Sequence, residues 1–116
     1  MTELELLREV AMLCLRYSVL LDHRLRPVHA SYELKGWPDC AMIGYAAAAF
    51  RELKNATRAV TPEQQHVGAR MLRAGLDWDV WRPADYDSGR IEWEVATLAG
   101  PGHALARALL LTGRRR

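Results

Sequence analysis

The chain has 116 residues, which is enough for one domain with a modest core, and we expect residues 1–116 to form a single domain. Half of the residues are apolar and 26% are charged, a balance typical of globular proteins and not of disordered ones. No apolar run reaches the roughly 18 residues of a membrane span, and the N-terminus does not resemble a secretory signal. We therefore expect a cytoplasmic protein without membrane contact. Cys14 and Cys40 fit neither a zinc motif nor a disulfide framework, and we expect both in the core.

The first predicted element is a helix over residues 2–20. Thr2 and Glu5 have the spacing of a capping box, and apolar residues repeat at helical spacing behind them. Glu3 falls within the apolar face, where a carboxylate needs a partner or a metal ion. The alternative is that Glu3 is exposed in the first turn and favoured there by the helix dipole.

Residues 21–38 are predicted to form a loop, with a short extended segment near residues 27–30. A strand is predicted over residues 39–45, after the breaker Gly36-Trp37-Pro38. The segment Phe50–Lys54 alternates as a strand does, so we expect a hairpin whose turn lies near residues 44–47 and whose second strand ends at Lys54.

A second helix is predicted to begin after Thr61, which has a capping-box partner in Gln64 and a proline at the first helical position. Gly75 is expected to end this helix. A strand over residues 78–81 is expected to stop at Arg82-Pro83. A helix over residues 89–98, a hinge at residues 100–102 and a short helix over residues 103–111 complete the predicted order.

Three polar residues of the hairpin are candidates for chemistry. Glu52 and Lys54 project to the same side of a strand, while Leu53 projects to the other. If the two strands pair as predicted, Asp39 lies beside Glu52. Two adjacent carboxylates repel each other unless a cation lies between them, and Mg²⁺ prefers such oxygen ligands. The alternative from this spacing is a surface hairpin with one ordinary Glu-Lys pair.

The chain contains, in this order, the four segments Gly36–Asp39, Phe50–Lys54, Thr61–Gln64 and Val80–Pro83. In their order and spacing they together resemble the VRR-NUC family, a virus-type replication and repair branch of the PD-(D/E)xK nucleases. The resemblance covers roughly residues 2–87. It implies an α/β fold with a central mixed sheet flanked by helices. It also implies divalent-metal-dependent cleavage of DNA phosphodiester bonds, in some members at branched structures.

The resemblance also implies roles for individual residues. Asp39 and Glu52 would be metal ligands, and Lys54 would be the catalytic lysine. Gln64 would match a helix glutamine near the site, and Glu3 would match a first-helix glutamate that joins the metal ligands. The implied cofactor is Mg²⁺, for which Mn²⁺ would substitute.

DNA contacts are expected from Arg24, Arg26, His29 and Lys35. A solvated loop is the alternative for the two arginines, and a structural role is the alternative for the lone histidine. Position 51 departs from the family pattern, because Arg51 stands where a small or apolar residue is usual. We expect its side chain to point away from Glu52, toward solvent or a neighbouring element.

Three further expectations concern the protein as a whole. Its many tryptophans and small core favour a homodimer, and the small size of the nuclease suggests a phage or bacterial origin by analogy. One alternative function is a catalytically inactive DNA-binding or assembly module with the same fold. Another is an interaction domain whose motifs match by chance.

Overall fold

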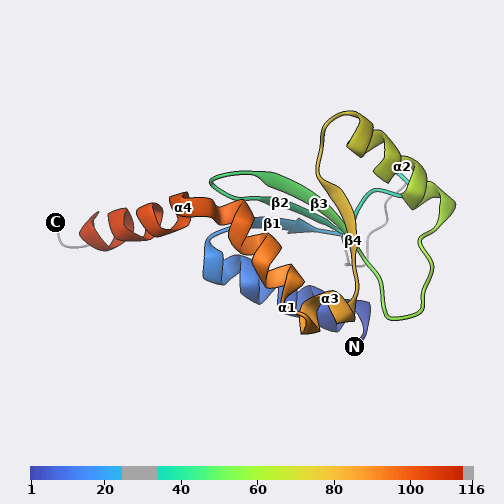
Figure 1. Ribbon diagram of the computed structural model, residues 1–116, viewed down its shortest axis with the longest axis horizontal. Coiled ribbons are helices and arrows are strands. Elements are labelled where there is room, and N and C mark those ends of the chain that lie inside the picture. Colours follow the sequence, from blue (N-terminus) through green and yellow to red (C-terminus); the bar gives the residue numbers. More distant parts are fainter. Residues whose placement is uncertain (25–33, 114–116) are drawn as a thin grey trace.

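The computed structural model describes residues 1–24 and 34–113, and of residues 102–113 it describes the backbone alone. The described chain is an α/β structure with a four-stranded mixed sheet flanked by helices (Figure 1). Its elements in chain order are α1 (Glu3–Tyr17), β1 (Leu20–His23), β2 (Cys40–Ile43), β3 (Ala48–Leu53), α2 (Pro62–Arg73), β4 (Trp78–Trp81), α3 (Pro83–Asp87) and α4 (Arg90–Gly113).

The strands are ordered β1-β2-β3-β4 across the sheet. The pairs β1–β2 and β2–β3 are antiparallel, whereas β4 runs parallel to β3. The predicted hairpin is confirmed, because β2 and β3 pair with Cys40 opposite Arg51 and are joined by a turn over residues 44–47. The prediction of loop from residue 21 was wrong at its start, where β1 pairs with β2. The extended segment predicted near residues 27–30 lies outside the described residues.

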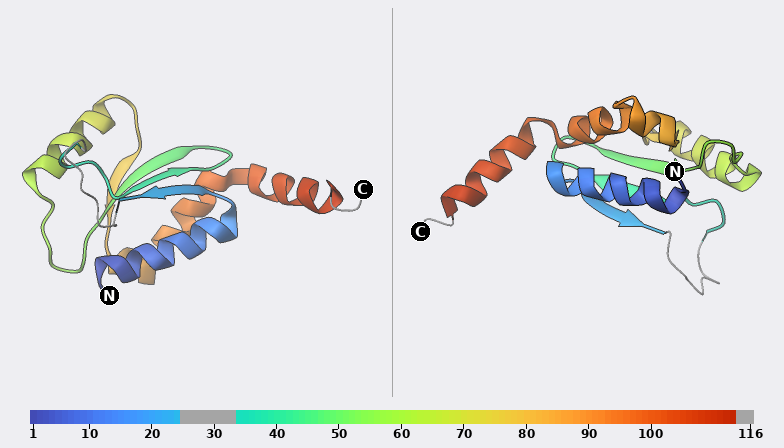
Figure 2. Two further views of the ribbon diagram at one scale, coloured as in Figure 1. Left: turned by 180° about the vertical axis from the view of Figure 1, so that it is seen from behind. Right: turned by 90° about the horizontal axis from the view of Figure 1, so that it is seen from below.

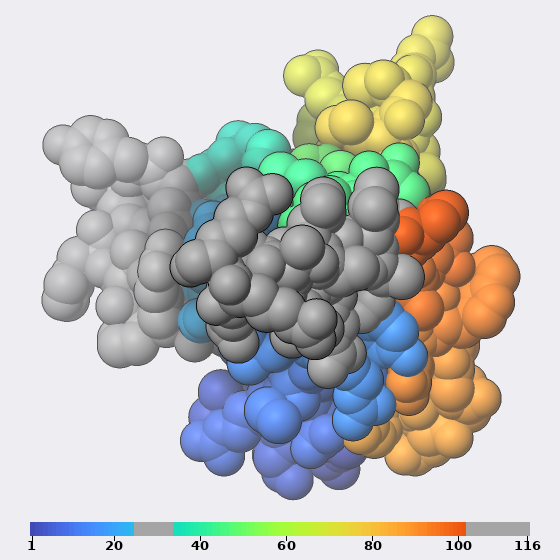
Figure 3. Space-filling view, turned by 90° about the vertical axis from the view of Figure 1, so that its left-hand side faces the viewer, coloured from blue at the N-terminus to red at the C-terminus, as the bar shows by residue number. Residues whose placement is uncertain are grey.

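The main core lies on one face of the sheet, beneath α1 and the first part of α4. These two helices lie side by side there, as the views in Figure 2 show. The opposite face carries α2, which packs near β4, so that α2 and the α1–α4 pair lie on opposite sides of the strands in Figure 3. The core between sheet and helices includes Leu6, Val10, Cys14, Cys40, Met42, Leu53, Trp81, Ile91 and Val95. Both cysteines are therefore core residues with free thiols, as predicted.

Residues close to the helix termini determine where most of the helices begin or end. Both predicted capping boxes are present, at Thr2 with Glu5 and at Thr61 with Gln64. Helix α1 ends at Tyr17, earlier than predicted, because Ser18 adopts a left-handed conformation with φ of 57°. A short helix, α3, follows β4 where a simple stop was predicted. The predicted hinge is confirmed at Gly100, whose non-helical backbone separates two helical parts of α4.

Candidate active site

Asp39 and Glu52 meet at one end of the sheet. The last pair of the β2–β3 register is Cys40 opposite Arg51, and Asp39 and Glu52 are the next residues of the two segments at this end. The Asp39 carboxylate accepts a hydrogen bond of 2.8 Å from the backbone N–H of Leu53. This bond holds the carboxylate against the end of β3, so the convergence predicted from the hairpin is present.

The Glu52 carboxyl group is almost completely buried, with 1% of the residue exposed. Its pKa is raised to about 9, first by burial and then by the hydrogen bond and negative charge of Asp39. Lys54 lowers this pKa through its positive charge, and Glu3 raises it further. Its Oε2 atom is buried and has no hydrogen-bond donor among the described residues. The negative charge of Asp39 therefore disfavours the charged form of Glu52 unless a cation lies between them.

Gln64 reaches Glu52 from α2. Its Nε2 atom donates a hydrogen bond of 2.9 Å to Glu52 Oε1, while its Oε1 atom accepts one of 2.9 Å from the backbone N–H of Thr61. The capping box therefore orients the amide, because the oxygen is held by the helix start and the nitrogen must face Glu52. The start of α2 and the end of β3 are tied together by this one side chain.

Lys54 follows β3 directly and is also buried, with 1% of the residue exposed. Its backbone N–H continues the ladder by donating to the carbonyl oxygen of Trp81 at 3.0 Å. Because it lies two residues after Glu52, its side chain leaves the strand on the same side. The positive charge of Lys54 acts on Glu52, because it lowers the Glu52 pKa that burial and Asp39 raise.

Glu3 approaches the same end of the sheet from the first turn of α1. Its carboxylate forms an ion pair of 3.2 Å with Arg58, and its side chain is 19% exposed. The carboxylate is thus neither fully solvated nor directed into the core, but it is close enough to raise the pKa of Glu52. Glu3 therefore acts on Glu52 through its charge, while its own carboxylate is paired with the Arg58 guanidinium.

Of the residues predicted to contact DNA, Lys35 and Arg24 are described, and both lie around this end of the sheet. Lys35 is exposed and forms an ion pair of 3.4 Å with Glu63 at the start of α2. The backbone N–H of Arg24 donates to the carbonyl oxygen of Asp39 at 2.9 Å, and its guanidinium donates to the carbonyl oxygen of Leu34 at 3.5 Å. Arg26 and His29 lie outside the described residues.

Arg51 points away from Glu52, as predicted, and enters the opposite face of the sheet. Its guanidinium pairs with Glu94 of α4 at 2.8 Å and with Asp77 at 3.0 Å. It also lies 5.2 Å from the ring centroid of Trp81. Only 3% of Arg51 is exposed, so its destination is a neighbouring element and not solvent.

Two features near the site were missed by the sequence reasoning. Arg82 donates to the carbonyl oxygens of Asn55 and Arg58, each at 2.8 Å, and so holds the loop that precedes α2. Asn55 closes the same loop with its side chain, which accepts from the backbone N–H of Arg58 at 2.7 Å. An asparagine just after a strand is a signal for such a turn.

The possible metal ligands at the site are hard carboxylate oxygens, and the Oε2 atom of Glu52, which is buried and accepts no hydrogen bond from the described residues, fits a divalent cation. Asp39 and Glu52 are the pair that would hold it, which matches the one or two carboxylates typical of Mg²⁺ sites that also bind substrate phosphate. The part of the chain that the structure describes contains no group of three or more His, Cys, Asp or Glu side chains placed to hold a metal ion. Glu3 therefore does not form a three-carboxylate group with Asp39 and Glu52.

Comparison with protein-family models, with curated proteins and with solved structures gives no match for this chain. Within the described residues, no helix has the length and apolar character needed to cross a membrane. The geometry of the site is therefore what supports a function.

Proposed function

We propose that this protein is a divalent-metal-dependent nuclease that hydrolyses DNA phosphodiester bonds, with a core of the PD-(D/E)xK type. The observation that carries the proposal is the meeting of two carboxyl groups, Asp39 and buried Glu52, with Lys54 and Gln64 at one end of the sheet. A mixed sheet flanked by helices is compatible with such a core. The resemblance of four ordered segments to the VRR-NUC family supports the same reaction.

Asp39 and Glu52 are the residues that would hold the metal ion. When bound, Mg²⁺ or Mn²⁺ would supply an activated water and would neutralise charge on the reacting phosphate. The protein prepares for this ion by fixing both carboxyl groups: the Leu53 N–H orients Asp39, and Gln64 orients Glu52. Glu3 is held by Arg58 and would act on the site from a distance through its charge.

Lys54 is the cation that the chain itself supplies. It lies on the same side of the strand as Glu52 and is shielded from water. A positive charge in such a buried place is worth more to a developing negative charge than one in water, because it is already oriented and poorly screened. We assign Lys54 to stabilising the charge that develops on the phosphate, and not to metal binding.

Cleavage of linear, flap and four-way-junction DNA in the presence of Mg²⁺, Mn²⁺, Ca²⁺ or chelator tests the proposal. Activity is expected with Mg²⁺ and Mn²⁺, and is expected to be lost in chelator and in the variants Asp39→Asn and Glu52→Gln. Asp87→Asn is the matched control, because Asp87 is exposed at the end of α3, and it should cleave like wild type. Full activity in excess chelator, or in both site variants, would exclude this function.

One observation favours a second candidate, a DNA-binding or assembly module without catalysis. The Glu3 carboxylate, which the family resemblance assigns to the metal, is bound by Arg58 instead. A calorimetric titration with Mg²⁺ or Mn²⁺ separates the two candidates. The nuclease must bind the ion with an affinity that falls in Glu52→Gln, whereas for the inactive module the titration should show no binding that depends on Glu52.

A further inference from the structure

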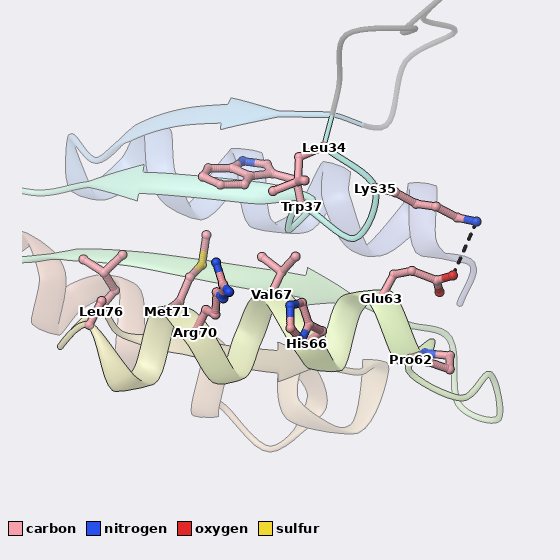
Figure 4. Close-up of a pocket in the computed structure, with 11 residues that line it drawn as sticks. Leu34, Lys35, Trp37, Pro62, Glu63, His66, Val67, Arg70, Met71 and Leu76 are labelled. Atoms are coloured by element: carbon pink, nitrogen blue, oxygen red, sulfur yellow. Dashed lines mark ion pairs between the residues drawn. The ribbon is translucent and has the colours of Figure 1, made fainter.

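A hollow lies between α2 and the segment that leads into β2. Its volume is about 610 Å³, within the range of small-molecule sites. The walls are mainly apolar, and Figure 4 shows Val67 and Met71 of α2 pointing across it toward Trp37 and Leu34. Leu76 closes the end of the hollow beyond α2. We call this hollow the Trp37 pocket.

Trp37 offers a prepared aromatic surface in this pocket. Its ring packs edge-to-face against Phe50 of β3, with centroids 6.2 Å apart and an angle of 79° between the planes. The residue nevertheless remains 39% exposed. A ring that is held by a neighbour and still open to solvent can stack on a flat aromatic ligand at little cost in conformational entropy.

The polar lining of the Trp37 pocket is predominantly basic. Arg70 and His66 extend from α2 beside the apolar wall, and Lys35 lies at the mouth (Figure 4). Glu63 also lines the pocket, but its carboxylate is engaged in the 3.4 Å ion pair with Lys35. Arg70 therefore gives the lining of the pocket a net positive charge. An apolar slot with a cationic edge matches a nucleobase joined to a phosphate.

The Trp37 pocket and the candidate active site are both built from the segment before β2 and the start of α2. Trp37 is two residues before Asp39, a span of about 7 Å at most. Glu63 of the pocket is followed by Gln64, which bonds Glu52. Gly36 allows the approach of the two segments: its φ is 89°, and a methyl group there would collide with the carbonyl group of Glu63. A strand whose phosphate lies at the carboxylate pair would thus bring a neighbouring base to the pocket.

We infer that the Trp37 pocket binds one unpaired nucleobase of the DNA strand, stacked on Trp37, with an adjoining phosphate at Arg70. This inference rests on the proposed nuclease function and specifies its substrate class. A base within a duplex is stacked on both faces and cannot enter, so the pocket selects strands with an unpaired nucleotide next to the bond that is cut.

The test measures binding of a short fluorescent single-stranded oligodeoxynucleotide in chelator, where no cleavage occurs. The same measurement uses a strand of equal length built of abasic residues. The variants are Trp37→Leu, which keeps apolar bulk, Trp37→Tyr, which keeps an aromatic face, and Arg70→Gln. The matched controls are Trp93→Leu, an exposed tryptophan on α4, and Arg73→Gln, an exposed arginine on α2 that does not line the pocket. Circular dichroism and thermal melting establish that each variant is folded.

Trp37→Leu should weaken binding of the normal strand roughly tenfold or more, as expected for loss of one stacked base, and should leave binding of the abasic strand unchanged. Trp37→Tyr should recover most of the loss, and Arg70→Gln should weaken both strands more than Arg73→Gln does. Equal effects of Trp37→Leu on normal and abasic strands, or no effect on either, would overturn the inference. If the protein cleaves DNA but Trp37→Leu binds both strands as wild type does, the base-binding role of the pocket is refuted and the nuclease function stands. If the normal strand is bound selectively through Trp37 but no DNA is cleaved, the nuclease function is refuted and the base-binding role stands.

Discussion

Glu52→Gln should make the metal-free protein more stable at neutral pH. In the folded chain the pKa of Glu52 is about 9, because burial and the neighbouring Asp39 disfavour its charged form, whereas the ordinary value is 4.5. Between these two pH values the folded state holds a proton that the unfolded chain has released. The contribution of Glu52 to stability is therefore greatest below pH 4.5 and falls as the pH rises toward 9.

The size of the effect follows from the same shift. Each pH unit between the two pKa values changes the contribution of Glu52 to the free energy of unfolding by about 1.4 kcal/mol, so this contribution should fall by about 3 kcal/mol between pH 4.5 and pH 7. Glutamine has nearly the same shape and cannot ionise. Its amide can also donate to the Asp39 carboxylate, which Glu52 can do only when protonated. At pH 7 the variant should thus exceed wild type by up to about 3 kcal/mol.

Urea denaturation in chelator, repeated at several pH values from about 5 to about 8, measures this difference. Wild type should lose stability across the range relative to Glu52→Gln, and Mg²⁺ should recover part of the loss because a bound cation displaces the shared proton. Glu63→Gln is the control: the pKa of Glu63 is lowered by a backbone hydrogen bond and by Lys35, so this variant should not gain stability as the pH rises. If wild type and Glu52→Gln show the same pH dependence, Glu52 is not the buried, proton-sharing group described here.

Three other substitutions have outcomes that the structure specifies. Lys54→Ala should bind Mn²⁺ at least as tightly as wild type in calorimetry, because a nearby positive charge is removed, yet it should cleave DNA slower by a factor on the order of 10²; unchanged cleavage would remove Lys54 from the chemistry. Arg51→Ala should lower the free energy of unfolding by about 2–3 kcal/mol in urea, since it removes a buried guanidinium that bonds Glu94 and the carbonyl oxygens of Phe50 and Asp77, although Glu94 keeps its ion pair with Arg90, and a loss below about 1 kcal/mol would contradict the buried ion pair. Gly36→Ala should destabilise the protein more than Gly75→Ala does in thermal melting: both glycines have a positive φ, which costs about 1–2 kcal/mol in alanine, but only Gly36 faces a backbone carbonyl of α2, and equal losses would show that this close approach is unimportant.

Short-range patterns were sufficient for much of the fold and for the centre of the candidate site. The capping boxes at Thr2 and Thr61 are closed by residues three positions later, so their hydrogen bonds can be read without knowledge of the rest of the chain. The common side of Glu52 and Lys54 follows from the two-residue period of a strand. The position of Asp39 followed from the hairpin, whose two strands are joined by a short turn.

Features that depend on distant segments could not be obtained in this way. Strand β1 has four residues without a regular apolar alternation, and it is a strand because its backbone pairs with β2. Arg51 reads as a surface residue until Glu94, 43 positions later, is placed beside it by the packing of α4. The bond from Gln64 to Glu52 and the Trp37 pocket likewise require α2 to lie against the segment before β2. Residue type and spacing report local hydrogen bonds and periodicity, whereas burial, and with it the raised pKa of Glu52, exists only when segments distant in the chain pack together and exclude water.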